Sequence, residues 1–183
     1  MNNRVTNKPT RLEYFVIPTC LCLSILVALY IPENILSHGW AKKYVEIMSA
    51  LVPYVERMPL SSPIPDIARF YFSFSWSFIV PVVFTLFVYG TWNPSERVLN
   101  IIQKNKTKCA LVTLFAGVIG YAFYSWPFEP DLNKHFTGLQ LNSRFGLGFW
   151  GGFEACGLAM CYGWFVFLTR YLLVLKARST TSP

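Results

Sequence analysis

Four long apolar segments dominate this sequence and constrain what it can fold into. Each is at or above the ~17–20 residues that a helix needs to cross the ~30 Å hydrocarbon core of a membrane. Only 14% of the residues are charged, against about 25% in a soluble domain, so most of the surface cannot face water. The sequence predicts an all-α integral membrane protein, a single polytopic domain over residues 1–183, with transmembrane helices at Tyr14–Ile31, Phe70–Tyr89, Cys109–Trp126 and Phe145–Leu175.

The distribution of cations predicts the orientation of these helices, because Lys and Arg accumulate on the cytoplasmic side of a membrane. Four crossings place both termini and the loop 90–108 on one side, which carries ten of the sixteen Lys and Arg. The outer loops 32–69 and 127–144 carry the other six cations, balanced by six acids. We therefore predict that both termini are cytoplasmic. The first segment could also be a cleaved signal peptide, but it is long for one and lacks a small-residue cleavage site.

The first outer loop contains a second kind of pattern. Apolar residues in Trp40–Val52 recur at helical spacings, with Lys42, Lys43 and Glu46 on the other side. This predicts a short amphipathic helix, which either lies on the membrane surface or packs on the end of the bundle. The prolines at 59, 63 and 65 predict a stiff, extended connection over Met58–Asp66.

The sequence indicates no enzyme, no cofactor and no metal. It contains no P-loop, no nucleophile elbow and no zinc-protease motif. His38 and His135 lie in the outer loops, and the five cysteines lie inside apolar segments, so neither set predicts haem or zinc ligands. The cations lie at the ends of apolar segments instead of clustering on one polar face, which argues against nucleic-acid binding.

Small residues form a continuous face on the fourth predicted helix and a shorter one on the third. Such faces let two backbones approach closely, which holds helices together in a membrane where no hydrophobic drive acts between them. We therefore expect these two faces to meet. The residues are Gly148, Gly152, Ala155, Ala159 and Gly163 on the fourth helix, and Ala110, Thr113, Gly117 and Gly120 on the third.

Glu154 is the one charged residue between Arg144 and Arg170. It lies about ten residues, or roughly 15 Å, from the outer end of its helix. A carboxyl at such depth is costly and normally faces a bundle interior, a cavity or a partner, and burial favours its neutral, protonated form. The candidate hydrogen-bond partners lie on the second helix, at Ser73, Ser77 and Thr85 and at the carbonyl that Pro81 frees.

Three interpretations of Glu154 follow: a structural hydrogen bond, a contact with a membrane partner, or a proton- or ion-handling site. With no catalytic motif, we expect a non-enzymatic function exercised by helix–helix contact with a membrane-protein partner or a second copy of the chain, in a lipid environment. The alternative is a small proton- or ion-coupled carrier that uses Glu154.

In outline alone, the chain resembles the immunity proteins against pore-forming colicins. It is equally similar in outline to exclusion-type proteins of conjugation and to small accessory subunits of respiratory and photosynthetic complexes. The outline consists of four helices, about 180 residues and cytoplasmic termini, and it carries no individual residues over. It implies an integral protein of the bacterial inner membrane.

Overall fold

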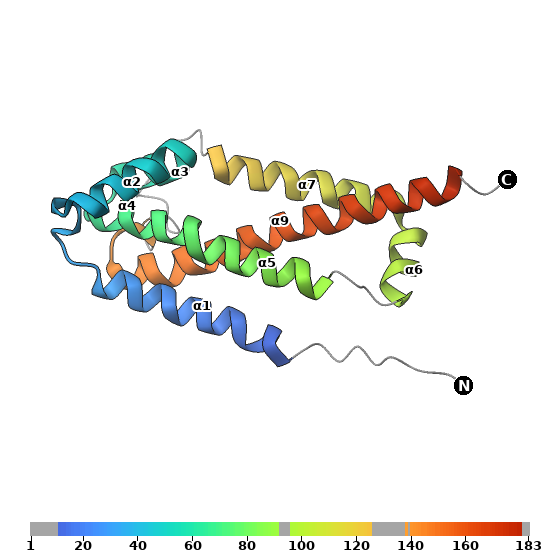
Figure 1. Ribbon diagram of the computed structural model, residues 1–183, viewed down its shortest axis with the longest axis horizontal. Helices are drawn as coiled ribbons and strands as arrows, with labels where there is room; N and C mark the ends of the chain where they lie inside the picture. The colour runs from blue at the N-terminus through green and yellow to red at the C-terminus, as the bar shows by residue number, and fades with distance from the viewer. Residues whose placement is uncertain (1–10, 92–95, 126–137, 139, 181–183) are drawn as a thin grey trace.

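The computed structural model describes residues 11–91, 96–125, 138 and 140–180, and these residues are almost entirely helical with no strand among them (Figure 1). Its α-helices are α1 (Arg11–Tyr30), α2 (Gly39–Leu51), α3 (Pro53–Arg57), α4 (Pro65–Phe74), α5 (Val80–Thr91), α6 (Glu96–Lys104), α7 (Lys106–Ser125) and α9 (Arg144–Thr180). Two 3-10 turns, η1 (Ile35–Ser37) and η2 (Met58–Ser61), and a π-helical turn, η3 (Ser75–Ile79), lie between these helices.

Three helical stretches are long and apolar enough to cross a membrane. They are Pro65–Tyr89, which runs through α4, η3 and α5, Lys106–Ser125 and Arg144–Leu173. The apolar part of α1 that the structure describes, Ile17–Tyr30, is shorter. The all-helical fold and the apolar membrane-type helices are thereby confirmed, whereas the fourth crossing and the orientation stay predictions.

Helix α9 is the centre of the bundle, and α1, α5 and α7 all pack against it (Figure 1). The short helices α2 and α3 lie at the end where α1 ends and α9 begins. Helix α6 lies across the other end of the bundle, on the side where α1 begins and α9 ends (Figure 1). The largest buried cluster joins α1 to α2, α3, α4 and the start of α9, at Ala28, Val55, Ala68, Tyr71 and Leu147 among others.

The amphipathic helix of the first outer loop is present as α2. Its buried residues Ala41, Val45 and Met48 pack it against the end of the bundle, whereas Trp40 and Leu51 stay exposed. The extended connection predicted over Met58–Asp66 is wrong. Proline fits the first turn of a helix, where its missing N–H is not needed, so Pro59 lies in η2 and Pro65 opens α4.

The cytoplasmic loop predicted at 90–108 contains a helix, α6, that lies outside the four apolar segments. The helix is only nine residues long and has one buried contact surface, centred on Ile102 against Phe167 and Leu168 of α9. The second outer loop, 127–144, lies outside the described residues except for 138, 140–143 and the start of α9.

Pro81 disturbs the second apolar helix in a specific way. The helix winds into a π-turn over Ser75–Ile79, in which the Val80 N–H reaches the Ser75 carbonyl five residues back. Proline has no N–H with which to continue the α-helical ladder. The π-turn lies directly before Pro81, as is common where one extra residue is accommodated within a helix.

The expectation that the small faces of α7 and α9 meet is wrong. Gly148 and Gly152 of α9 face α1, where a Cβ on Gly148 would lie 2.7 Å from the Ile25 Cα. Gly163 faces the Phe87 ring of α5. Ala155 and Ala159 are buried with residues of α1, η3 and α5, including Cys20, Ile79 and Val83.

The glycines of α7 instead face aromatic rings of α9. Gly117 contacts Phe165, and Gly120 lies against Tyr162, whose hydroxyl donates to the Gly120 carbonyl at 2.7 Å. Spacing alone shows which small residues share a face, but not whether a backbone or a large ring fills the space before them. Here α1 approaches α9 backbone to backbone, whereas aromatic rings of α9 lie between α9 and the glycines of α7.

The close approach of α1 predicts that Gly148→Ala destabilises the protein by about 1–3 kcal/mol, the usual cost of overpacking a filled interior. Gly157→Ala is the matched control on the same helix, because a Cβ there meets nothing within 4 Å. Reversible unfolding in mixed micelles, followed by circular dichroism, measures both. Equal stability of the two variants would contradict the packing described for α1 and α9.

Candidate functional site

The Glu154 carboxyl lies between two buried hydrogen-bond donors. The Tyr54 hydroxyl of α3 donates to Glu154 Oε1 at 2.6 Å, and the Gln140 side-chain amide donates to Oε2 at 2.5 Å. Tyr54 and Gln140 are each 1% exposed, and Glu154 itself is half-buried. The carboxyl therefore connects α9 both to the helical cap at this end of the bundle and to the segment that precedes α9.

A proline turn places Tyr54 against α9. Helix α2 ends at Leu51, and Val52 is extended, with φ −132° and ψ 97°. A residue before proline is driven out of the helical region, so Pro53 ends α2 and opens α3. The turn directs Tyr54 into the bundle, where its ring lies edge-on to Phe72 with centroids 5.2 Å apart.

The environment of Tyr54 keeps its hydroxyl protonated. Burial is the main cause that raises the pKa of Tyr54 well above its ordinary value of 10.0, and the neighbouring Glu154 carboxyl raises it further. A neutral phenol can donate, whereas a phenolate cannot. Tyr54 is therefore able to donate to Glu154 at physiological pH.

The end of α7 also meets the α2–α3 turn. The Tyr124 hydroxyl donates to the Leu51 carbonyl at 2.7 Å, at the C-terminus of α2 where carbonyls lack partners within the helix. Arg57 of α3 reaches the Ser125 carbonyl at 3.4 Å. The α2–α3 turn thus joins α7 and α9 at this end of the bundle.

A second buried polar cluster lies on the first turns of α9. The Ser24 hydroxyl of α1 donates to the Gly148 carbonyl at 2.6 Å, so it accepts from the Tyr71 hydroxyl of α4, also at 2.6 Å. Gly151 and Gly152 leave room for this cluster, since a Cβ on Gly151 would lie 2.7 Å from the Tyr71 ring. These glycines therefore admit a hydrogen-bonded junction of α1, α4 and α9.

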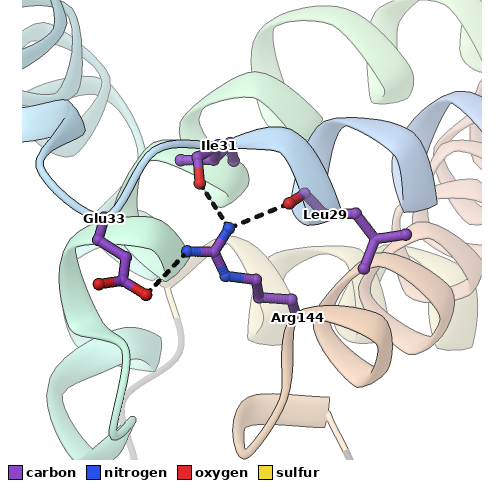
Figure 2. Close-up of polar contacts among 4 residues, drawn as sticks. All are labelled: Leu29, Ile31, Glu33 and Arg144. Atoms are coloured by element: carbon purple, nitrogen blue, oxygen red, sulfur yellow. Dashed lines mark hydrogen bonds and ion pairs between the residues drawn. The ribbon is translucent and has the colours of Figure 1, made fainter.

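Arg144, the first residue of α9, clamps the end of α1 (Figure 2). Its Nη1 donates to the carbonyls of Leu29 at 3.0 Å and Ile31 at 2.8 Å. Its Nη2 pairs with Glu33 at 3.4 Å, but the Glu33 side chain is 89% exposed, and such surface pairs contribute little. The carbonyl contacts matter more, because they satisfy acceptors that a helix C-terminus leaves free and that attract a cation.

The predicted partners of Glu154 are wrong. Ser73 is buried but donates to the Arg69 carbonyl at 2.8 Å within its own helix. Ser77 is exposed and hydrogen-bonds with Tyr44 of α2. Pro81 and Thr85 are exposed as well. These candidates lie on the neighbouring apolar helix, whereas the two donors come from the outer connections, where Pro53 is the sequence signal of a turn.

An open apolar groove runs along the membrane-type region between α7 and the second half of α9. Its volume is about 650 Å³. One side of the groove is lined by α7, through Ala110, Thr113, Leu114, Gly117, Val118 and Tyr121. The other side is lined by α9, through Phe165, Thr169, Leu172 and Leu173. Only 17% of the most apolar window of α7 is buried, against 39% for the other two candidate spans, so α7 is the least covered of the three.

The described residues include no group of three or more His, Cys, Asp and Glu side chains that could hold a metal ion. The chemistry that the site displays is hydrogen bonding: two donors on one carboxyl, and one hydroxyl relay from Tyr71 through Ser24 to a backbone carbonyl. Both arrangements join helices.

The two donors predict losses of stability of different size for two substitutions of Glu154. Glu154→Leu leaves the Tyr54 hydroxyl and the Gln140 amide without an acceptor, at about 1–3 kcal/mol for each unsatisfied buried donor. Glu154→Gln should cost less than about 1 kcal/mol, because its carbonyl can accept from Tyr54 and its amide can donate to a flipped Gln140. Thermal unfolding in detergent measures both.

The control for these variants is the exposed Glu56 of α3. Glu56→Leu and Glu56→Gln should each change the stability by less than about 0.5 kcal/mol, as is usual for surface positions. If Glu154→Leu is as stable as Glu154→Gln, the carboxyl does not hold Tyr54 and Gln140 in place.

No protein-family model matches the sequence, and neither the curated proteins nor the solved structures compared with it show a significant similarity.

Proposed function

We propose that the protein is a non-enzymatic integral membrane protein that acts by helix–helix contact with a membrane-protein partner. The observation that carries this proposal is the open groove between α7 and α9, which lies along two candidate membrane spans. Ala110 provides a small, exposed side chain along it. Small residues let a second helix approach closely, which favours helix association inside a membrane.

The dimensions of the groove suit a helix. From Ala110 to Tyr121 it follows α7 for about three turns, or roughly 16 Å. The aromatic rings that α9 places against the α7 glycines keep the two backbones apart and leave the groove open to one side. Phe165 and Leu173 supply apolar contact area on the wall that α9 contributes.

In the topology that accompanies this proposal, the chain crosses a bacterial inner membrane four times, by α1, the α4–α5 stretch, α7 and α9. Both termini then lie in the cytoplasm. Support comes from the shared axis along which these helices run in alternating directions (Figure 1). It also comes from Lys104 of α6 and from Lys106 and Lys108 at the start of α7. Reporters fused after Pro183 and within residues 133–139 should then lie on opposite sides of the membrane. Reporters on the same side would contradict this topology.

A photo-crosslinking pair tests the partner contact directly. Leu114 lines the groove and Phe115, its neighbour, does not, yet their exposed fractions are 66% and 65%. A photoreactive residue at Leu114 in the native membrane should form a defined protein adduct, whereas one at Phe115 should mainly label lipid. Lipid labelling alone at both positions, or the same protein adduct at both, would contradict a specific helix contact in the groove.

A small proton- or ion-coupled carrier that uses Glu154 is the second candidate. It is favoured by the position of this one carboxyl within the candidate span Arg144–Leu173. A carrier of this kind predicts ion flux in liposomes that contain this protein alone. It also predicts that Glu154→Gln folds normally but loses this flux completely. The partner contact is the better supported function, because Glu154 is occupied by two donors that fix other parts of the bundle.

A further inference from the structure

Helix α6 connects two membrane-type helices and lies across the bundle axis (Figure 1). It follows α5, the last part of the candidate span Pro65–Tyr89, and leads into α7, the candidate span Lys106–Ser125. A short crosswise helix between two crossings lies at the membrane–water boundary, where amphipathic helices bind lipid. This placement rests on α5 and α7 crossing the membrane and is independent of any protein partner.

The two sides of α6 differ in what they contact. Ile102 is 3% exposed and packs on Phe167 and Leu168 of α9, which fixes the helix to the bundle. The adjacent Ile101 is 52% exposed. An exposed isoleucine at a membrane boundary can insert among acyl chains while the polar residues beside it remain at the level of the headgroups.

The charge that follows Ile101 along the chain has one sign. Lys104, Lys106 and Lys108 are all exposed, and none of them forms an ion pair with a residue that the structure describes. The sequence contains no Asp or Glu from residue 97 to residue 128, so no acid in this stretch of chain neutralises them. Lysines held at the surface of a membrane are attracted to anionic lipids.

We propose that α6 and the first turn of α7 form a binding surface for anionic phospholipid headgroups, with Lys104, Lys106 and Lys108 as the phosphate contacts and Ile101 as the apolar anchor. The occupant is a lipid and not a free anion, because the lysines lie beside an exposed apolar side chain at the end of two candidate spans. The contact should weaken with salt, since exposed charges are screened.

The test uses the purified full-length protein in a neutral detergent, titrated with phosphatidylglycerol, with bound lipid counted by native mass spectrometry. Phosphatidylcholine with the same acyl chains and inorganic phosphate are the comparison ligands. The proposal expects phosphatidylglycerol to bind well above both. Equal binding of phosphatidylcholine, or displacement of phosphatidylglycerol by millimolar phosphate alone, would overturn it.

Two variants that remove the same charge locate the site. Lys106→Gln/Lys108→Gln should weaken phosphatidylglycerol binding about ten- to thirty-fold, given the attraction of each lysine to an anionic surface. Lys42→Gln/Lys43→Gln removes two exposed lysines of α2 at the opposite end and should leave it unchanged. Ile101→Asn should also weaken it. Identical binding by the two lysine variants would overturn the proposal, and unchanged helicity shows that each variant is folded.

Discussion

The end of the bundle that holds α2 and α3 depends on the hydrogen bonds that the Glu154 carboxyl accepts from Tyr54 and Gln140. Within a membrane, apolar contact gives little preference for one helix neighbour over another, because lipid tails are as apolar as leucine. Polar groups that have no water available must instead find each other. One carboxyl on α9 therefore joins this helix to the α2–α3 turn, and the Tyr124 hydroxyl joins the end of α7 to the same turn.

The remaining order in the fold comes from how α9 meets each of its neighbours. Its glycines admit the backbone of α1 and the Ser24–Tyr71 relay, and Arg144 caps the last carbonyls of α1. Towards α7 the same helix presents the rings of Phe165 and Tyr162, which lie against the α7 glycines. The unfilled space between these two helices is the groove that we assign to a partner. Stability and the proposed function thus depend on different contacts of one helix.

The sequence predicted the helical elements well and their neighbours poorly. Apolar length places a helix over each of the four segments, since a segment that must satisfy its backbone in lipid has few alternatives. Residue spacing identified one face through Gly148 and Gly152, but the partner of that face depends on α1 coming close enough for Ser24 to reach it. The donors to Glu154 were missed because Tyr54 and Gln140 lie in connections, where no periodic pattern indicates which side chains turn inwards. Helix α6 was missed because nine residues are too few for a membrane pattern.

A double-mutant cycle between Glu154 and Tyr54 tests the central claim most directly. Glu154→Leu, Tyr54→Phe and the double variant are unfolded reversibly in the same mixed micelles, and the free energies of unfolding give the coupling between the two side chains. If the hydroxyl and the carboxyl hold α3 on α9, the coupling energy is about 1–3 kcal/mol, the range found for residues in one hydrogen-bond network. Effects that simply add, with coupling near zero, would show that α3 is held by its apolar contacts and that Glu154 does not organise the bundle.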